Sequence, residues 1–173
     1  MKFAAGFLVA LLLVGAASVS PRVSRNNLAG LEQATDAKLK ALEVNEPGSL
    51  LGATRGVYLE GYGAVFTTEL DLLGFAAPNP FRPAYSKAEI AKLKLRKQGR
   101  IVMMKHRMQE SLVIMAQQLE GVPANEQIAL AITIPYWPWE EATGMPRQIL
   151  MQAPKSALLD PGKLNASLKV LEF

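Results

Sequence analysis

Residues 56–73, GVYLEGYGAVFTTELDLL, decide the fold of this chain. Two runs rich in β-branched and aromatic residues flank a central Gly-Tyr-Gly, a pattern that predicts a β-hairpin with a three-residue turn. In the second run apolar and polar side chains alternate, so Phe66 is expected on a packed face and Glu69 on a wetter one. The hairpin is therefore expected in the middle of a sheet.

The segments around the hairpin alternate between helical and strand patterns. Apolar residues at helical spacing predict one helix over residues 26–44 and a long helix that opens on the capping-box sequence Ser-Lys-Ala-Glu at residues 86–89 and runs to residue 119. Gly99 leaves open whether the long helix is continuous or kinked. Apolar runs of strand length predict three further strands, at residues 126–135, 147–153 and 165–173.

The order of these elements predicts the class of fold. A hairpin and a helical crossover in one chain are typical of α+β domains. We therefore expect a single α+β domain over residues 24–173. Its sheet would have four or five mainly antiparallel strands, with the N-terminal helix and the long helix packed on one face.

The first twenty residues have the three parts of a secretory signal peptide. Lys2 is followed by an apolar run and then by the small residues Gly-Ala-Ala-Ser at 15–18. This pattern predicts a leader, residues 1–17, that is cleaved after Ala17 or Ser18, and a protein that is periplasmic or secreted. An uncleaved anchor stays open, because residues 3–19 approach the length that spans a bilayer.

Composition limits the chemistry that the chain can perform. It has 173 residues, no cysteine, one histidine and a formal net charge of +4. Disulfides, thiol nucleophiles and Cys/His zinc sites are excluded, and only His106 could serve a Ser-His-Asp arrangement. The small basic surplus falls short of a typical nucleic-acid-binding domain. We therefore expect no cofactor and no nucleic-acid partner, and His106 is expected on the wet side of the long helix.

Three glutamates are the candidates for catalysis. Glycoside hydrolysis needs two carboxylates, and Glu60 could pair with Glu140 or Glu141. The alternative function is thus a small carboxylate-dependent hydrolase acting on peptidoglycan or polysaccharide. Solvated carboxylates at strand ends are the simpler interpretation.

A dense basic stretch is the first candidate for partner binding. Residues 87–107 hold eight Lys and Arg residues and a single carboxylate, Glu89. Such density could meet an anionic envelope surface, and a solvated helix face is the simpler interpretation. The residues that share one helical face are Lys92, Arg96, Arg100 and Arg107.

An aromatic segment is the second candidate for partner binding. Tyr136, Trp137 and Trp139 follow the apolar strand at 126–135, where a proline-broken loop begins. Aromatic side chains on loops can anchor a protein partner or stack on sugar. A local cap over the end of the sheet is the simpler interpretation.

The hairpin GVYLEGYGAVFTTELDL, followed by a long helix and an apolar strand, resembles a group of uncharacterised exported bacterial proteins. The resemblance covers residues 56–135 and is strongest over GVYLEGYGAVF. It implies a shared fold and export, and it supplies no catalytic residue. The sequence thus favours a non-catalytic exported protein with a binding or structural role in the bacterial cell envelope. Its partner would be an envelope protein or an anionic envelope surface, and no integral membrane segment would remain after cleavage.

Overall fold

The computed structural model describes residues 23–42, 48–74 and 84–173. The predicted leader lies outside these residues. In chain order the elements are α1 (Arg25–Lys40), β1 (Ser49–Leu50), β2 (Arg55–Leu59), β3 (Gly63–Asp71), α2 (Lys87–Gln118), β4 (Gln127–Thr133), β5 (Gln148–Pro154), α3 (Lys155–Leu158), α4 (Pro161–Ser167) and β6 (Lys169–Glu172). The predicted α+β class is confirmed.

The strands form one mixed sheet, in the order β1-β3-β4-β5-β6, and β2 pairs with β3 next to β1. β3 and β4 are parallel, because α2 carries the chain back along the sheet between them, and every other pair is antiparallel. The predicted mainly antiparallel sheet is therefore confirmed. The hairpin was expected in the middle of the sheet; its strand β3 is an inner strand, but β2 lies at the edge. The two-residue β1 is an addition that the sequence did not predict.

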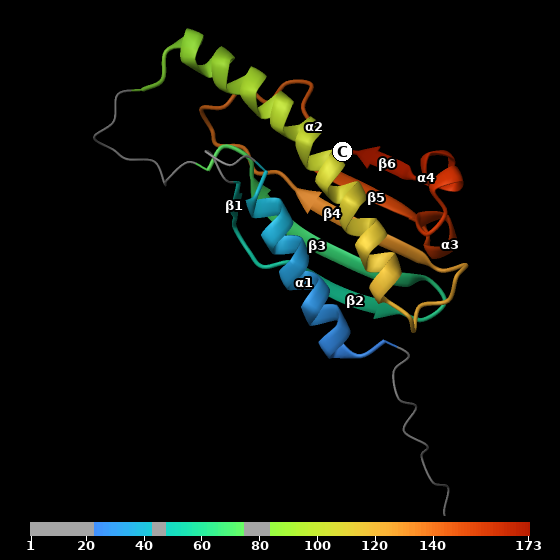
Figure 1. The fold of residues 1–173 in the computed structure, drawn as a ribbon. Helices are drawn as coiled ribbons and strands as arrows, with labels where there is room; N and C mark the ends of the chain where they lie inside the picture. The colour runs from blue at the N-terminus through green and yellow to red at the C-terminus, as the bar shows by residue number, and fades with distance from the viewer. Residues whose placement is uncertain (1–22, 43–47, 75–83) are drawn as a thin grey trace, which may run out of the picture.

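α1 and α2 lie side by side over one face of the sheet (Figure 1). The predicted capping box opens α2: the Ser86 hydroxyl accepts the Glu89 N–H at 3.3 Å, and the Glu89 carboxylate accepts the Ser86 N–H at 2.8 Å. α2 then runs through Gly99 as one helix of 32 residues. Gly99 is tolerated there because it lies on the exposed side, where a Cβ would meet nothing within 4 Å.

The core lies between this helical layer and the sheet. Phe66 in β3 is fully buried and Glu69 is exposed, which confirms the predicted facing of the strand. The Phe66 ring lies against Gly56 of β2, where an added Cβ would come within 2.5 Å of a ring carbon. Inward-facing side chains that share this core with Phe66 include Leu70, Met104, Met108, Leu112, Ile128, Leu130, Ile132 and Ile149.

Gly63 fixes the contact between the hairpin and β4. Its φ is +131°, and an added Cβ would lie 1.8 Å from the carbonyl oxygen of Gln127. Only glycine tolerates both that φ and that close approach. The turn itself comprises residues 60–62, one residue earlier than the Gly-Tyr-Gly pattern predicted.

The last predicted strand is shorter than expected. Residues 161–167 form α4, and only residues 169–172 form β6. The reason is local: the Asp160 carboxylate accepts the Gly162 N–H at 2.9 Å, and Pro161 stands at the first position of the helix, where a missing N–H costs nothing.

Candidate functional site

The face of the sheet opposite α1 and α2 is the candidate functional surface, and we call it the open face. Phe66 points toward the helices, so its neighbours Val65 and Thr67 point the other way. Strand register extends each of these positions across the sheet. One row of the open face is Arg55, Thr67, Ala131, Leu150 and Leu171, and the next is Val57, Val65, Ala129, Gln152 and Lys169.

The open face carries exposed apolar side chains on its two edge strands. Val57 and Leu59 on β2 are 49% and 47% exposed, and Leu171 on β6 is 44% exposed. Thr67, Glu69, Thr133 and Gln148 are also exposed on it and are polar. The exposed apolar side chains thus lie on the edge strands β2 and β6, and the exposed polar ones lie on β3, β4 and β5 between them. Surfaces that bind other molecules reversibly are similarly mixed in polarity.

Tyr62 adds an aromatic ring to the open face. Its hydroxyl donates to the Gln152 side-chain oxygen of β5 at 2.8 Å, so the residue reaches from the hairpin turn across β4. The ring is 39% exposed. An aromatic ring with a polar tip suits a contact that is partly apolar and partly wet. Sequence reasoning treated this residue only as part of a turn and missed its position, because nothing local in the chain predicts the contact with Gln152.

Two side chains of α1 bind the backbone of Gly56 at the β2 edge of the sheet. The Glu32 carboxylate accepts the Gly56 N–H at 2.6 Å, and the Arg25 guanidinium donates to the Gly56 carbonyl at 3.2 Å. Arg25 and Glu32 also form a two-bond ion pair at 2.6 and 2.7 Å. The hydrogen bond from Arg25 holds the pKa of Glu32 below its usual range. The N–H and C=O of Gly56 are thereby withheld from other chains.

The basic stretch of α2 does not form one surface. Arg100 is buried and donates to the Leu72 carbonyl, so it cannot contact an external anionic surface, and its placement on the binding stripe is wrong. Arg100 can be buried because its guanidinium donates a hydrogen bond to the Leu72 carbonyl. Of the remaining stripe, Lys92 is exposed, Arg96 is half-buried and Arg107 donates to Glu110 at 3.1 Å.

Other cations of the stretch are held by carboxylates. Lys94 lies 3.7 Å from Glu141, and Lys105 pairs with Glu172 of β6. Hydrogen bonds from Lys38 and then from Arg107 lower the pKa of Glu110. The charges that sequence reasoning grouped are thus shared among several local ion pairs, and the attraction to an anionic surface is correspondingly reduced.

The aromatic segment after β4 packs against the structure's own elements. The Tyr136 hydroxyl donates to the Pro146 carbonyl at 2.9 Å, and burial raises the pKa of this hydroxyl to about 12. Trp139 packs on Tyr85, with ring centroids 4.5 Å apart, and Trp137 is half-buried. These contacts describe a local cap on the start of α2, and they bring the three rings to a different place from the open face.

A buried ion pair fastens this aromatic segment to α2. Lys97 Nζ lies 2.6 Å from Glu140 Oε2, 2.8 Å from the Pro135 carbonyl oxygen and 3.8 Å from the centre of the Tyr136 ring. The side chains of the pair are only 1% and 4% exposed. Burial lowers the pKa of Lys97, and the bond to Glu140 opposes that shift. Sequence reasoning assigned Lys97 to the basic stretch, since its partner lies 43 positions away.

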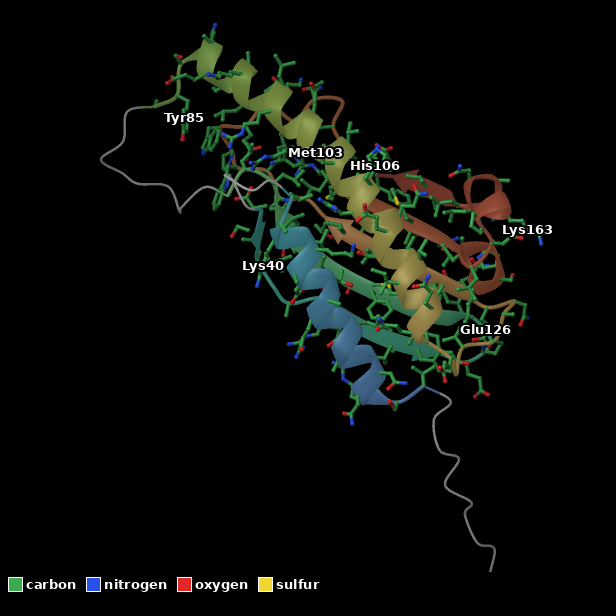
Figure 2. The ribbon with its side chains drawn as sticks, in the orientation of Figure 1. Lys40, Tyr85, Met103, His106, Glu126 and Lys163 are labelled. Carbon is green, nitrogen blue, oxygen red and sulfur yellow. The ribbon has the colours of Figure 1, made fainter. Side chains whose placement is uncertain are left out.

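The three candidate glutamates do not meet. Glu60 is in the turn next to Gly61, whose N–H donates to Glu126 at 3.3 Å, whereas Glu140 belongs to the segment that contacts Tyr85 through Trp139. Figure 2 shows Glu126 and Tyr85 at opposite ends of the sheet. β4 lies between them and spans seven residues, roughly 20 Å at about 3.3 Å per residue. Glycosidase carboxylates lie at most about 9.5 Å apart, so neither predicted pair has a catalytic separation.

His106 lies on the exposed side of α2, as expected (Figure 2). It borders an open hollow of about 630 Å³ between α1, α2 and α4, together with Glu110 and Lys38. Glu110 already accepts a bond from Lys38 at 3.1 Å. Across residues 23–42, 48–74 and 84–173, no three His, Asp or Glu side chains lie close enough to hold a metal ion. No helix in those ranges is long and apolar enough to span a membrane.

Comparison of the chain with models of protein families, with curated proteins and with solved structures finds no match. The resemblance of the hairpin to exported bacterial proteins therefore stays a prediction.

Proposed function

We propose that the protein is a non-catalytic exported binding protein of the bacterial cell envelope, and that it contacts its partner through the open face. The observation that carries the proposal is the helix-free face of the described sheet, on which Val57, Leu59 and Leu171 are each about half exposed. One wet face is normal for an antiparallel sheet, but that face usually alternates to polar residues. Burying these side chains against a partner would add about 25 cal/mol per Å² of apolar surface.

The chemistry of the open face favours a protein partner over an anionic surface. Its charged residues are of both signs, with Arg55 and Lys169 on one side and Glu69 on the other. The cations of α2, which would attract anionic lipid or phosphate, are mostly buried or paired. Lys92 with Arg96 is the part of the predicted stripe that stays a candidate for such contact. The hydrolase alternative has no support from Glu60, Glu140 or Glu141, because these residues do not converge.

Export is tested by the mass of the intact protein recovered from the envelope fraction. We expect a mass that lacks residues 1–17 or 1–18, because the sequence has the three parts of a cleaved leader. A mass that includes the leader would favour a membrane anchor instead. Recovery of the protein only from the cytoplasmic fraction would contradict export.

Binding through the open face is tested by charge substitution with a matched control. Val57→Glu with Leu59→Glu places two carboxylates on the open face, whereas Val102→Glu with Leu95→Glu makes the same chemical change at exposed positions of α2. All four residues are exposed, so we expect both double variants to melt close to the wild type. Affinity purification from envelope extracts, quantified by mass spectrometry, is the measurement.

We expect the proteins enriched by the wild type to be retained by the α2 variant and reduced more than about tenfold by the open-face variant, which corresponds to about 1.4 kcal/mol of binding free energy. Equal enrichment by both variants would contradict the proposed surface. Loss in the α2 variant alone would move the binding site to the helical side.

A further inference from the structure

The two edges of the sheet differ in how their backbone groups are satisfied. At β2, Arg25 and Glu32 bind the outward carbonyl and N–H of Gly56. β6 ends the sheet on the other side, and no described strand lies beyond it. Natural sheets close or charge their edges because a free edge pairs with other chains. At the β2 edge side chains bind the backbone of Gly56, whereas no hydrogen bond between a side chain and an outward backbone group of β6 is found in the described structure.

The pairing of β6 with β5 shows which groups face outward. Phe173 exchanges backbone hydrogen bonds with Gln148, in both directions, at 2.9 and 3.1 Å. Antiparallel strands alternate between bonded and non-bonded pairs, so Leu171 also bonds to β5. The N–H and C=O groups of Val170 and Glu172 therefore point away from β5, in the plane of the sheet and toward its free edge.

We propose that β6 pairs with β6 of a second copy of this chain, antiparallel, about a two-fold axis at Leu171. In that register Val170 of each copy lies opposite Glu172 of the other, and the two residues exchange both backbone bonds. The outward N–H and C=O groups of β6 can thus be fully paired by the same groups of a second copy. A register shifted by two residues, with the axis at Val170, would place Glu172 of each copy opposite Leu168 of the other, and Leu168 caps α4 and lies outside the strand.

The side chains fit the same register. A perpendicular two-fold axis keeps both helical layers on one side, so residues that lie opposite each other must share a face. Leu171 would meet its own copy on the open face, where non-bonded pairs bring Cα atoms to about 4.5 Å. Phe173 would lie beside the stem of Lys169 on that face. The apolar residues covered, Val170, Leu171 and Phe173, are now 40%, 44% and 66% exposed.

Charge does not oppose this contact. An unpaired Glu172 carboxylate would disfavour pairing of this edge with another strand. Here the carboxylate is paired with Lys105 of α2. The pairing would also join two open faces into one continuous surface. The proposal concerns the edge of the sheet and stands independently of the proposed envelope partner.

Val170→Pro is the variant that tests the edge. It removes an outward N–H and leaves the bonds of Leu171 and Lys169 to β5 intact, and proline is tolerated on an edge strand when its missing N–H faces solvent. Val170→Thr is the matched control, since it keeps the N–H and the β-branched shape. The measurement is the association state by sedimentation velocity over a concentration series, on protein in the N-terminal form that intact-mass analysis identifies.

We expect a dimer for the wild type and for Val170→Thr, and a dissociation constant at least about tenfold larger for Val170→Pro, because two outward backbone bonds are lost. The melting temperature of the monomeric fraction should match in all three proteins. A wild type that stays monomeric across the series would overturn the proposal. A dimer that Val170→Pro does not weaken would overturn it too, because the contact would then lie elsewhere.

Discussion

Phe66→Ala is expected to lower the free energy of unfolding by about 3–5 kcal/mol, because it leaves a ring-sized cavity at the centre of the core. Phe66 is fully buried, and its ring packs directly on Gly56 of the neighbouring strand. Glu69→Ala changes the exposed face of the same strand and should cost far less. Chemical denaturation of the three proteins is the measurement, and equal midpoints for the two variants would contradict the facing of β3.

Gly56→Ala sharpens this test through the contact with Phe66. In the wild type the added Cβ would come within 2.5 Å of the ring, which predicts a cost of about 1–3 kcal/mol from overpacking. In the Phe66→Ala background the same methyl enters the cavity, so its cost should vanish or reverse. The double-mutant cycle should therefore show favourable coupling between the two substitutions. Additive effects would mean that the ring does not occupy the space over Gly56.

Lys97→Met is expected to lower the free energy of unfolding by about 3–5 kcal/mol, because it leaves the buried Glu140 carboxylate without its cation. It also removes the bond to the Pro135 carbonyl and the cation over the Tyr136 ring. Thermal or urea unfolding measures the change. The tryptophan fluorescence of the folded variant should also differ from that of the wild type, since this ion pair holds the segment that carries Trp137 and Trp139.

Two companion variants separate burial from charge. Lys94→Met removes the neighbouring pair to Glu141, whose side chain is 49% exposed, and should have a much smaller effect than Lys97→Met. Lys97→Met with Glu140→Gln removes both charges and should recover a large part of the loss. If Lys94→Met and Lys97→Met proved equally destabilising, the Lys97 pair would not be the buried one.

The elements of the fold were largely predictable because their signals are local. The capping box at Ser86, the alternation around Phe66 and the apolar run of β4 each depend on residues a few positions apart. The parallel pairing of β3 with β4 was not predicted, although a long helix between two strands is a connection that permits it. The boundary of β6 was missed because Asp160 and Pro161 start a helix that outweighs the apolar pattern after it.

The surface could not be predicted, because it depends on contacts between distant parts of the chain. Arg100 and Lys97 have the sequence pattern of a solvated basic face, yet each reaches a buried oxygen, from Leu72 and from Glu140. From the sequence, Glu60 could pair with Glu140 or Glu141; the structure shows that the length of β4 lies between them. Along each strand the residues of the open face alternate with core residues, as in any strand with one buried face. Only the position of α1 and α2 on the other face shows that the open face is uncovered by these helices (Figure 1).

The most direct test of the open face is site-specific photo-crosslinking in intact cells. A photoreactive residue at Thr67 would lie in the middle of the open face, and one at Gln117 would lie at an exposed position of α2. Both positions are exposed, so the label itself should disturb neither fold. We predict a discrete adduct with another envelope protein from Thr67 and none from Gln117. Adducts from Gln117 alone, or equal adducts from both positions, would contradict the claim that the open face is the binding surface.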